Sequence, residues 1–152
     1  MITVRHYTGD KFYLRKDLDI FRALTNGYKG AMIETLDHKY HEDHIFVMRE
    51  NGKIIGWASA SRLWSGGYYK SDSFYLSFFI DEKHRGRGLA KRFPVALRRW
   101  IPENNYVLGF HYESVRRLMN NRCVEVISRD DGWYGWDKYK LIKKEPKNET
   151  KV

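Results

Sequence analysis

Residues 80–90 read IDEKHRGRGLA, from Ile80 to Ala90. Before them stands Phe74–Ile80, the most apolar segment of the chain, and after them the apolar residues up to Trp100 recur at helical spacing. This pattern predicts a buried strand, a loop with glycines and a helix, in that order. Glycines let a backbone approach a ligand closely, and a helix start offers unpaired N–H groups at the positive end of its dipole. The loop therefore has the chemistry of a site for an anion such as phosphate.

Two common phosphate-binding motifs do not match this loop. The dinucleotide fingerprint G-x-G-x-x-G needs a third glycine after Gly86 and Gly88, where the sequence has Lys91. The nucleotide motif G-x-x-x-x-G-K-S/T is absent from the sequence. Taken alone, the run from Arg85 to Gly88 could also be a plain turn or an arginine–glycine segment that binds nucleic acid. Its interpretation therefore depends on the rest of the chain.

Working outward from the loop, seven segments have the alternating or wholly apolar pattern of β-strands. These segments are Ile2–Tyr7, Ile45–Arg49, Lys53–Leu63, Phe74–Ile80, Tyr106–Phe110, Val124–Ile127 and Trp136–Ile142. Asn51-Gly52 follows the second segment and is a strong signal for a hairpin turn. A predicted helix joins Phe74–Ile80 to Tyr106–Phe110, so these two strands must be parallel if they are neighbours.

Four segments have helical spacing. They run from Lys11 to about Tyr28, from Ala31 to about Tyr40, from about Leu89 to Trp100, and from Ser114 to Asn121. With a length of 152 residues, the chain suits one domain. We therefore predict a single α/β domain over residues 1–143, in which about four helices flank a mixed sheet of about seven strands. Residues 144–152 are rich in Lys, Glu and Asn and are expected to form a flexible basic tail.

The charge of the chain limits its partners. Lys and Arg number 28 against 19 Asp and Glu, so the formal net charge is +9. Such an excess favours nucleic acid, phosphate-rich ligands or an acidic protein partner. Because Asp and Glu are interspersed, a solvated surface that is merely basic explains the charge equally well. A free polyamine would be repelled unless its binding site were locally acidic.

Cysteine content and hydropathy bear on the compartment. Cys123 is the single cysteine, so no intramolecular disulfide can form, which fits a reducing compartment. The N-terminal segment MITVRHY has no apolar signal region, and no run approaches the roughly 20 apolar residues of a membrane span. We therefore expect a cytoplasmic protein with no membrane partner.

The residues Arg85-x-x-Gly88-x-Ala90 match the pattern Gln/Arg-x-x-Gly-x-Gly/Ala. This is the acetyl-CoA loop of the GNAT superfamily of N-acetyltransferases. The expected order of strands and helices and the length of the chain also resemble GNAT proteins, over about residues 2–142. The resemblance implies a GNAT-like sheet with splayed central parallel strands, and transfer of an acetyl group from acetyl-CoA directly to a primary amine.

The resemblance also implies which residues contact acetyl-CoA. In GNAT proteins the pantetheine arm lies between the two splayed strands and bonds to the backbone of the first. Carried over, Phe78, Phe79 and Ile80 would contact pantetheine. The pyrophosphate would be held by backbone N–H groups of Arg85, Gly86, Arg87, Gly88, Leu89 and Ala90, joined by Lys91. GNAT proteins are often dimers, so a homodimer is an expected assembly.

A catalytic residue is harder to assign. Family members often carry a tyrosine, in the pattern N-x-x-A/S-x-x-L-Y, that protonates the leaving thiolate. Here the matching run begins at Tyr112, Leu118 fits, and Met119 occupies the tyrosine place, where it cannot donate a proton. His111 and Tyr112 directly follow the second splayed strand and are the candidate catalytic residues, because the attacking amine must lose a proton. Either could instead have a purely structural role.

Two other interpretations stay open. His38, His41 and His44 are spaced three apart, which spreads them around a helix, so no metal site is expected. The acceptor, a small molecule or a protein, carries no readable motif. The main alternative to an enzyme is a non-catalytic module on the same fold, which uses its basic, aromatic surface on nucleic acid or a protein partner.

Overall fold

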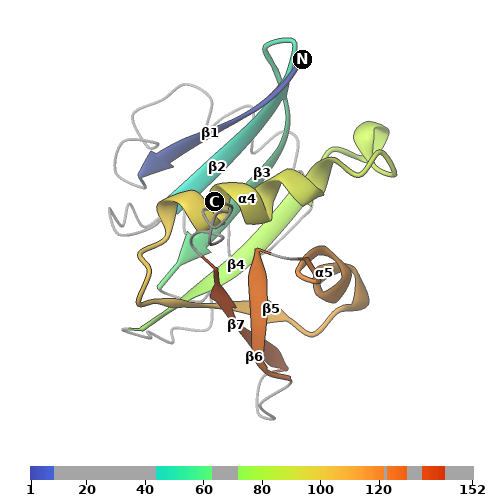
Figure 1. Cartoon of the computed structure of the whole chain (residues 1–152). Helices are drawn as coiled ribbons and strands as arrows, with labels where there is room; N and C mark the ends of the chain where they lie inside the picture. Colours follow the sequence, from blue (N-terminus) through green and yellow to red (C-terminus); the bar gives the residue numbers. More distant parts are fainter. Residues whose placement is uncertain (9–43, 63–71, 122, 130–134, 143–152) are drawn as a thin grey trace, which may run out of the picture.

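A seven-stranded mixed sheet forms the centre of the computed structural model, which describes residues 1–8, 44–62, 72–121, 123–129 and 135–142 (Figure 1). Its strands are β1 (Ile2–Thr8), β2 (His44–Glu50), β3 (Lys53–Ser61), β4 (Ser73–Ile80), β5 (Tyr106–Phe110), β6 (Val124–Ser128) and β7 (Trp136–Leu141). The spatial order is β1-β2-β3-β4-β5-β7-β6. All seven predicted strands are confirmed, and β2 and β3 are joined at the predicted Asn51-Gly52 turn.

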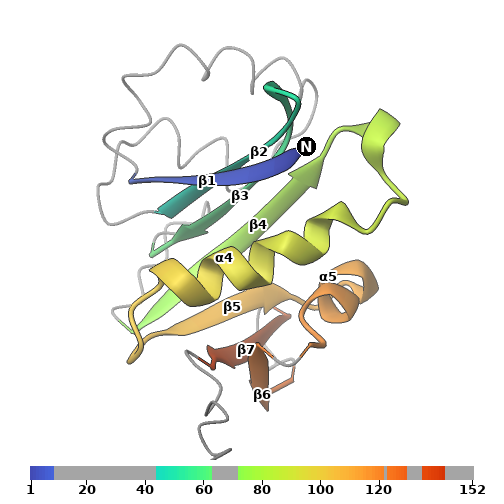
Figure 2. The ribbon, with the colours of Figure 1, turned by 45° about the horizontal axis from the view of Figure 1, so that its top comes forward.

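The parallel pair β4 and β5 separates along its length. Their register runs from Ser73 opposite Tyr106 to Tyr75 opposite Leu108 and stops there. Beyond this point β4 stays paired with β3 as far as Ile80, while β5 stays paired with β7. Figure 2 shows the two strands diverging toward their C-terminal ends. The predicted splay between the central parallel strands is therefore present.

Four short helices are described. They are the 3₁₀-helices η1 (Glu82–His84) and η2 (Leu89–Lys91) and the α-helices α4 (Arg92–Trp100) and α5 (Glu113–Leu118). The helix expected from Leu89 thus begins with a 3₁₀ turn, and α5 is shorter than the expected Ser114–Asn121. The helices expected within residues 11–40 and the tail expected at 144–152 lie outside the described residues. In the described part of the chain, no helix is long and apolar enough to cross a membrane.

The main core lies between α4 and the sheet (Figure 2). Phe93 and Leu97 of α4 are fully buried against Phe46, Phe74 and other strand residues. At 20–33 cal/mol per Å² of apolar surface, each such side chain contributes about 2 kcal/mol on burial. This packing fixes the start of α4, and with it the end of the loop that precedes the helix.

A histidine pair closes one end of this core. Nε2 of His6 on β1 and Nδ1 of His44 on β2 share a hydrogen bond of 2.8 Å. The His6 ring also stacks on Trp100 of α4, with centroids 4.1 Å apart and planes at 6°. Burial lowers the pKa of His6 from 6.5 to about 4, because the charged imidazolium would lose its hydration there.

We expect this histidine to make folding sensitive to acid. Between pH 6.5 and about 4 the unfolded chain binds a proton on His6 that the folded chain does not, so stability falls as the pH falls through this window. One proton corresponds to at most about 1.4 kcal/mol per pH unit. His6→Phe keeps the stacked ring and removes the titration, so its urea midpoint should vary less between neutral pH and about pH 5. Parallel pH curves for the two proteins would contradict this assignment.

Candidate active site

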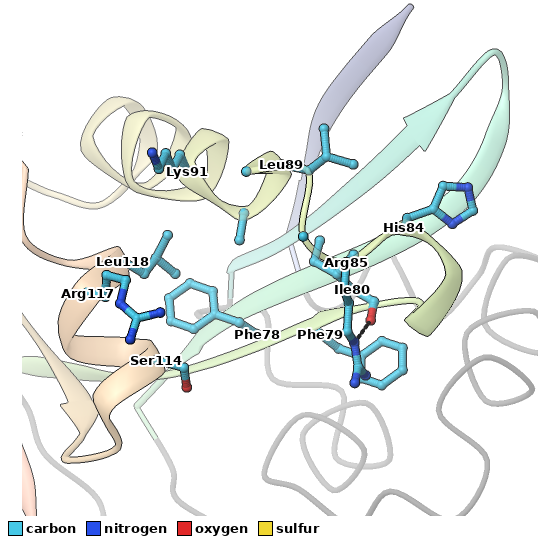
Figure 3. Close-up of a pocket in the computed structure, with 13 residues that line it drawn as sticks. Phe78, Phe79, Ile80, His84, Arg85, Leu89, Lys91, Ser114, Arg117 and Leu118 are labelled. Carbon is cyan, nitrogen blue, oxygen red and sulfur yellow. Dashed lines mark hydrogen bonds between the residues drawn. The ribbon is translucent and has the colours of Figure 1, made fainter.

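A cleft of about 690 Å³ opens beside the end of β4, where that strand has parted from β5 (Figure 3). Its walls are the end of β4, the loop that follows, η2 and the face of α5 that carries Ser114, Arg117 and Leu118. The residues that line it are Phe78, Phe79, Ile80, His84, Arg85, Gly86, Gly88, Leu89, Ala90, Lys91, Ser114, Arg117 and Leu118. All the residues that the sequence predicts to contact acetyl-CoA are in this set except Arg87. His84, Ser114, Arg117 and Leu118 were not among the predicted site residues.

The end of β4 presents aromatic rings and backbone to the cleft. Phe78 points into it and its ring lies 5.9 Å from that of Phe93 in the core. The Ile80 carbonyl accepts a 2.7 Å hydrogen bond from Nε of Arg85, drawn as a dashed line in Figure 3. The Arg85 guanidinium also lies 5.3 Å from the centre of the Phe79 ring. The Arg85 side chain therefore folds back over the strand end and adds its charge to the cleft wall.

The loop depends on glycine for its backbone conformation. Gly86 has φ 82° and Gly88 has φ 74°, values that cost most L-residues about 1–2 kcal/mol. A Cβ atom at Gly88 would meet no atom within 4 Å, so lack of space is not the reason for glycine. Gly88 is the N-cap of η2, which runs directly into α4. The left-handed residue therefore sets the direction of the loop backbone where the helix begins.

The Arg87 side chain does not line the cleft. Its two terminal nitrogens donate to the two carboxylate oxygens of Glu50, at 3.0 and 2.7 Å. The hydrogen bond from Arg87 holds the pKa of Glu50 below its usual range. The Glu50 carboxylate therefore stays ionised at neutral pH. Because the Arg87 side chain is engaged with Glu50, only the backbone N–H of Arg87 remains for the predicted contact with pyrophosphate.

Other cations do reach the cleft. Lys91 of η2 and Arg117 of α5 both line it (Figure 3). The Arg117 side chain is 75% exposed, and its guanidinium lies 3.9 Å from the carboxylate of Glu113. Together with Arg85, these side chains make the cleft attractive to an anion.

His111 and Tyr112 follow the end of β5 but do not line this cleft. Nδ1 of His111 lies 3.0 Å from the carbonyl oxygen of Gly135, and the backbone N–H of His111 donates to the same oxygen at 2.9 Å. Because a carbonyl only accepts, Nδ1 must carry the hydrogen, which leaves the lone pair of Nε2 free to accept a proton. Tyr112 is 60% exposed and its ring lies 4.7 Å from that of Phe110.

Comparison with known proteins gives the cleft a context. Residues 11–111 match the family model described as Acetyltransferase (GNAT) family. The chain belongs to the GNAT family. This match spans more than half of the chain and includes β4, the glycine loop, α4 and β5. None of the curated proteins compared with the chain matches it significantly.

Solved structures share the GNAT fold. A spermidine N-acetyltransferase SpeG chimera, from Vibrio cholerae and hSSAT, superposes with a TM-score of 0.60 at 16% identity, covering 93% of this chain and 95% of its own. YncA from Salmonella typhimurium, solved with its cofactor acetyl-CoA, gives 0.56 at 14% identity, with 95% and 96% covered. The ribosomal-protein-alanine N-acetyltransferase from Brucella melitensis gives 0.55 at 17% identity, with 91% and 96% covered. At these identities the likeness establishes the fold.

Met119, which occupies the tyrosine place of the GNAT motif in the sequence, does not line the cleft. Ser114, Arg117 and Leu118 form the face of α5 that lines the cleft, as their spacing of three and four requires. Met119 is only 1% exposed and belongs to the core. Leu118 thus lines the cleft, whereas its neighbour Met119 packs inside the fold. Neither side chain can donate a proton, whereas the hydroxyl of Ser114 can.

A metal centre receives no support from the described residues. Within them, no group of three or more His, Cys, Asp or Glu side chains is placed to hold an ion. His44 is bound to His6, while His38 and His41 lie outside the described residues.

Proposed function

We propose that this GNAT protein transfers the acetyl group of acetyl-CoA directly to a primary amine. The observation that carries the proposal is the parting of β4 from β5 beside a glycine loop that leads into a helix. The cleft of about 690 Å³ is within the usual range for small-molecule sites. Membership of the GNAT family supports the same chemistry.

The residues of the cleft fit the parts of acetyl-CoA. Backbone N–H groups from Gly86 to Ala90 would hold the pyrophosphate, with Lys91 and Arg117 supplying positive charge. The N–H of Arg85, also predicted for this role, already donates to the Glu82 carbonyl at 3.3 Å. The backbone of Phe78–Ile80 would bind the pantetheine arm, at the stretch of β4 that has no partner in β5. Acetyl-CoA supplies an acetyl group that is activated as a thioester.

The proposed proton acceptor is Nε2 of His111, which takes a proton from the amine directly or through one water molecule. Its support is the bond from Nδ1 to the Gly135 carbonyl, which fixes both the tautomer and the ring orientation. Tyr112 is the second candidate, because its exposed hydroxyl stands next to His111 in the chain. Among the residues that line the cleft, Ser114 carries the hydroxyl group closest in sequence to His111 and Tyr112.

A matched pair of substitutions at Gly88 tests the acetyl-CoA site. Asn and Asp have nearly the same shape and both tolerate a positive φ, and a Cβ has open space at this position. Only Asp adds a negative charge, which should repel the pyrophosphate. We expect calorimetry to show that Gly88→Asp binds acetyl-CoA about ten- to thirtyfold more weakly than Gly88→Asn. Equal affinities, or a wild type that binds no acetyl-CoA, would contradict the proposed function.

A non-catalytic binding module is the second candidate, and Met119 in the tyrosine place of the GNAT motif favours it, because methionine cannot donate a proton. On that hypothesis the chain would bind nucleic acid in a strongly salt-dependent manner and would not release CoA from acetyl-CoA with any amine.

A further inference from the structure

The glycine loop is held from outside by the β2–β3 hairpin. Arg87, in the middle of the loop, forms a two-pronged ion pair with Glu50, 37 residues earlier at the end of β2. Bidentate arginine–carboxylate pairs fix orientation as well as distance. This pair therefore joins two segments that no strand register connects.

Three further contacts hold the start of the loop. His84 lies between two carboxylates, with Nε2 3.6 Å from Oε1 of Glu50 and Nδ1 3.3 Å from Oδ2 of Asp81. The backbone N–H of Asp81 donates to the Ile55 carbonyl of β3 at 2.7 Å. We call Glu50, Asp81, His84 and Arg87 the loop clamp. The clamp connects the hairpin with both the beginning and the middle of the loop.

A loop with two glycines needs such support. Gly86 and Gly88 have access to more backbone conformations than other residues, and ordering them on ligand binding costs free energy. Their neighbour Arg87 is held by Glu50, so the ion pair restricts the intervening backbone before any ligand arrives. Preorganised donors bind an anion more tightly than donors that must first be ordered.

We propose that Glu50 and Arg87 are positioning residues for the pyrophosphate of acetyl-CoA, and that Arg87 acts through Glu50 rather than by contacting phosphate. This inference rests on the proposed function, and it adds a residue of β2, outside the loop motif, to the determinants of cofactor affinity. The Arg87 guanidinium is occupied by two carboxylate oxygens, whereas Arg85, Lys91 and Arg117 line the cleft.

If Arg87 instead contacts phosphate, Glu50→Gln should change the affinity for acetyl-CoA in the opposite direction. If Arg87 left Glu50 to bind phosphate, Glu50→Gln would release it and acetyl-CoA would bind more tightly. If the clamp positions the loop, Glu50→Gln weakens binding by about three- to fivefold, because loop residues that an exposed ion pair had held must then be ordered on binding. Glu50→Gln removes a negative charge, so simple electrostatic attraction also predicts tighter binding. A loss of affinity is thus specific to positioning.

The experiment is calorimetric titration of acetyl-CoA into the wild type, Glu50→Gln, Arg87→Glu and the charge swap Glu50→Arg with Arg87→Glu. The swap restores an arginine–carboxylate pair, so it should recover at least about threefold of the affinity lost in Arg87→Glu. Lys83→Met, in η1 of the same loop, is the control for a lost surface charge and should change affinity less than about twofold. Hydrogen exchange of the free proteins should show faster exchange at residues 85–91 in Glu50→Gln.

The outcomes separate the two proposals. A wild type that binds no acetyl-CoA overturns the proposed function, and this role for the clamp with it. A wild type that binds acetyl-CoA, together with a Glu50→Gln variant that binds as well or better, overturns the clamp alone. A charge swap no better than Arg87→Glu would mean that Arg87 contacts phosphate, which also overturns it.

Discussion

His111→Gln lowers kcat/KM for acetyl transfer by about a hundredfold or more, the usual contribution of a general base. Glutamine keeps a donor for the Gly135 carbonyl but cannot take a proton from the amine. The dissociation constant for acetyl-CoA should stay within about twofold, because His111 does not line the cleft proposed to bind it. The rate is followed as CoA thiol released with whichever primary amine of a panel the wild type acetylates.

Gly135 provides an independent test of the same histidine. A Cβ atom at Gly135 would collide with the His111 ring, so Gly135→Ala must displace the imidazole. The substitution is also strained by its φ of 72°, which makes the single variant ambiguous. The double variant removes the ambiguity. If Gly135 acts by placing His111, Gly135→Ala costs little further activity once His111 is Gln. Full activity in His111→Gln would exclude the histidine as the base.

The elements that the sequence predicts best are those specified by local pattern. Each strand was placed to within two residues, because alternation and apolar runs are read over neighbouring residues. Most of the cleft wall was predicted for a related reason. The motif covers residues 85–90, and the end of β4 directly precedes the loop in sequence, so the resemblance extends to both.

The residues missed are those set by contacts between distant segments or by the phase of a helix. The direction of the Arg87 side chain depends on Glu50, 37 residues away, and no local pattern indicates that pair. In α5 each residue turns about 100° around the axis, so Leu118 lines the cleft while the next residue, Met119, packs into the core. A signal was available, since Val115 and Met119 are four residues apart and both pack against the core.

Asp137→Ala lowers the free energy of unfolding by about 3 kcal/mol, the lower end of the range for breaking a buried ion pair. Asp137 of β7 is fully buried and accepts two hydrogen bonds from Arg116 of α5, at 2.6 and 2.9 Å. Arg129 and the Tyr139 hydroxyl also lie within 3.3 Å of its oxygen Oδ2. Arg116 is 33% exposed and regains some hydration when the aspartate is removed, which keeps the effect below the top of the range.

The protonated hydroxyl of Tyr139 adds a hydrogen bond to this cluster of side chains around Asp137. Burial and the charge of Asp137 raise the pKa of Tyr139 to about 12, so its hydroxyl keeps its proton and remains a donor at neutral pH. Asp137→Asn keeps the shape and one acceptor oxygen, and it should therefore destabilise less than Asp137→Ala in urea unfolding. A loss below about 1 kcal/mol in Asp137→Ala would mean that the cluster adds no more than a surface pair.

Loss of the pair between Asp137 and Arg116 should also affect the cleft. Arg116 belongs to α5, and another face of α5 lines the cleft. The ion pair of Arg116 with Asp137 helps to hold α5 against β7, and with it the cleft-lining residues of that helix. At temperatures where Asp137→Asn is still folded, we therefore expect acetyl-CoA to bind about two- to fivefold more weakly, since α5 must be reordered on binding. Glu113→Gln serves as the control, because its pair with Arg117 is exposed, with side chains 80% and 75% accessible. Equal losses in the two variants would attribute the effect to Arg117 alone rather than to the anchoring of the helix by Asp137.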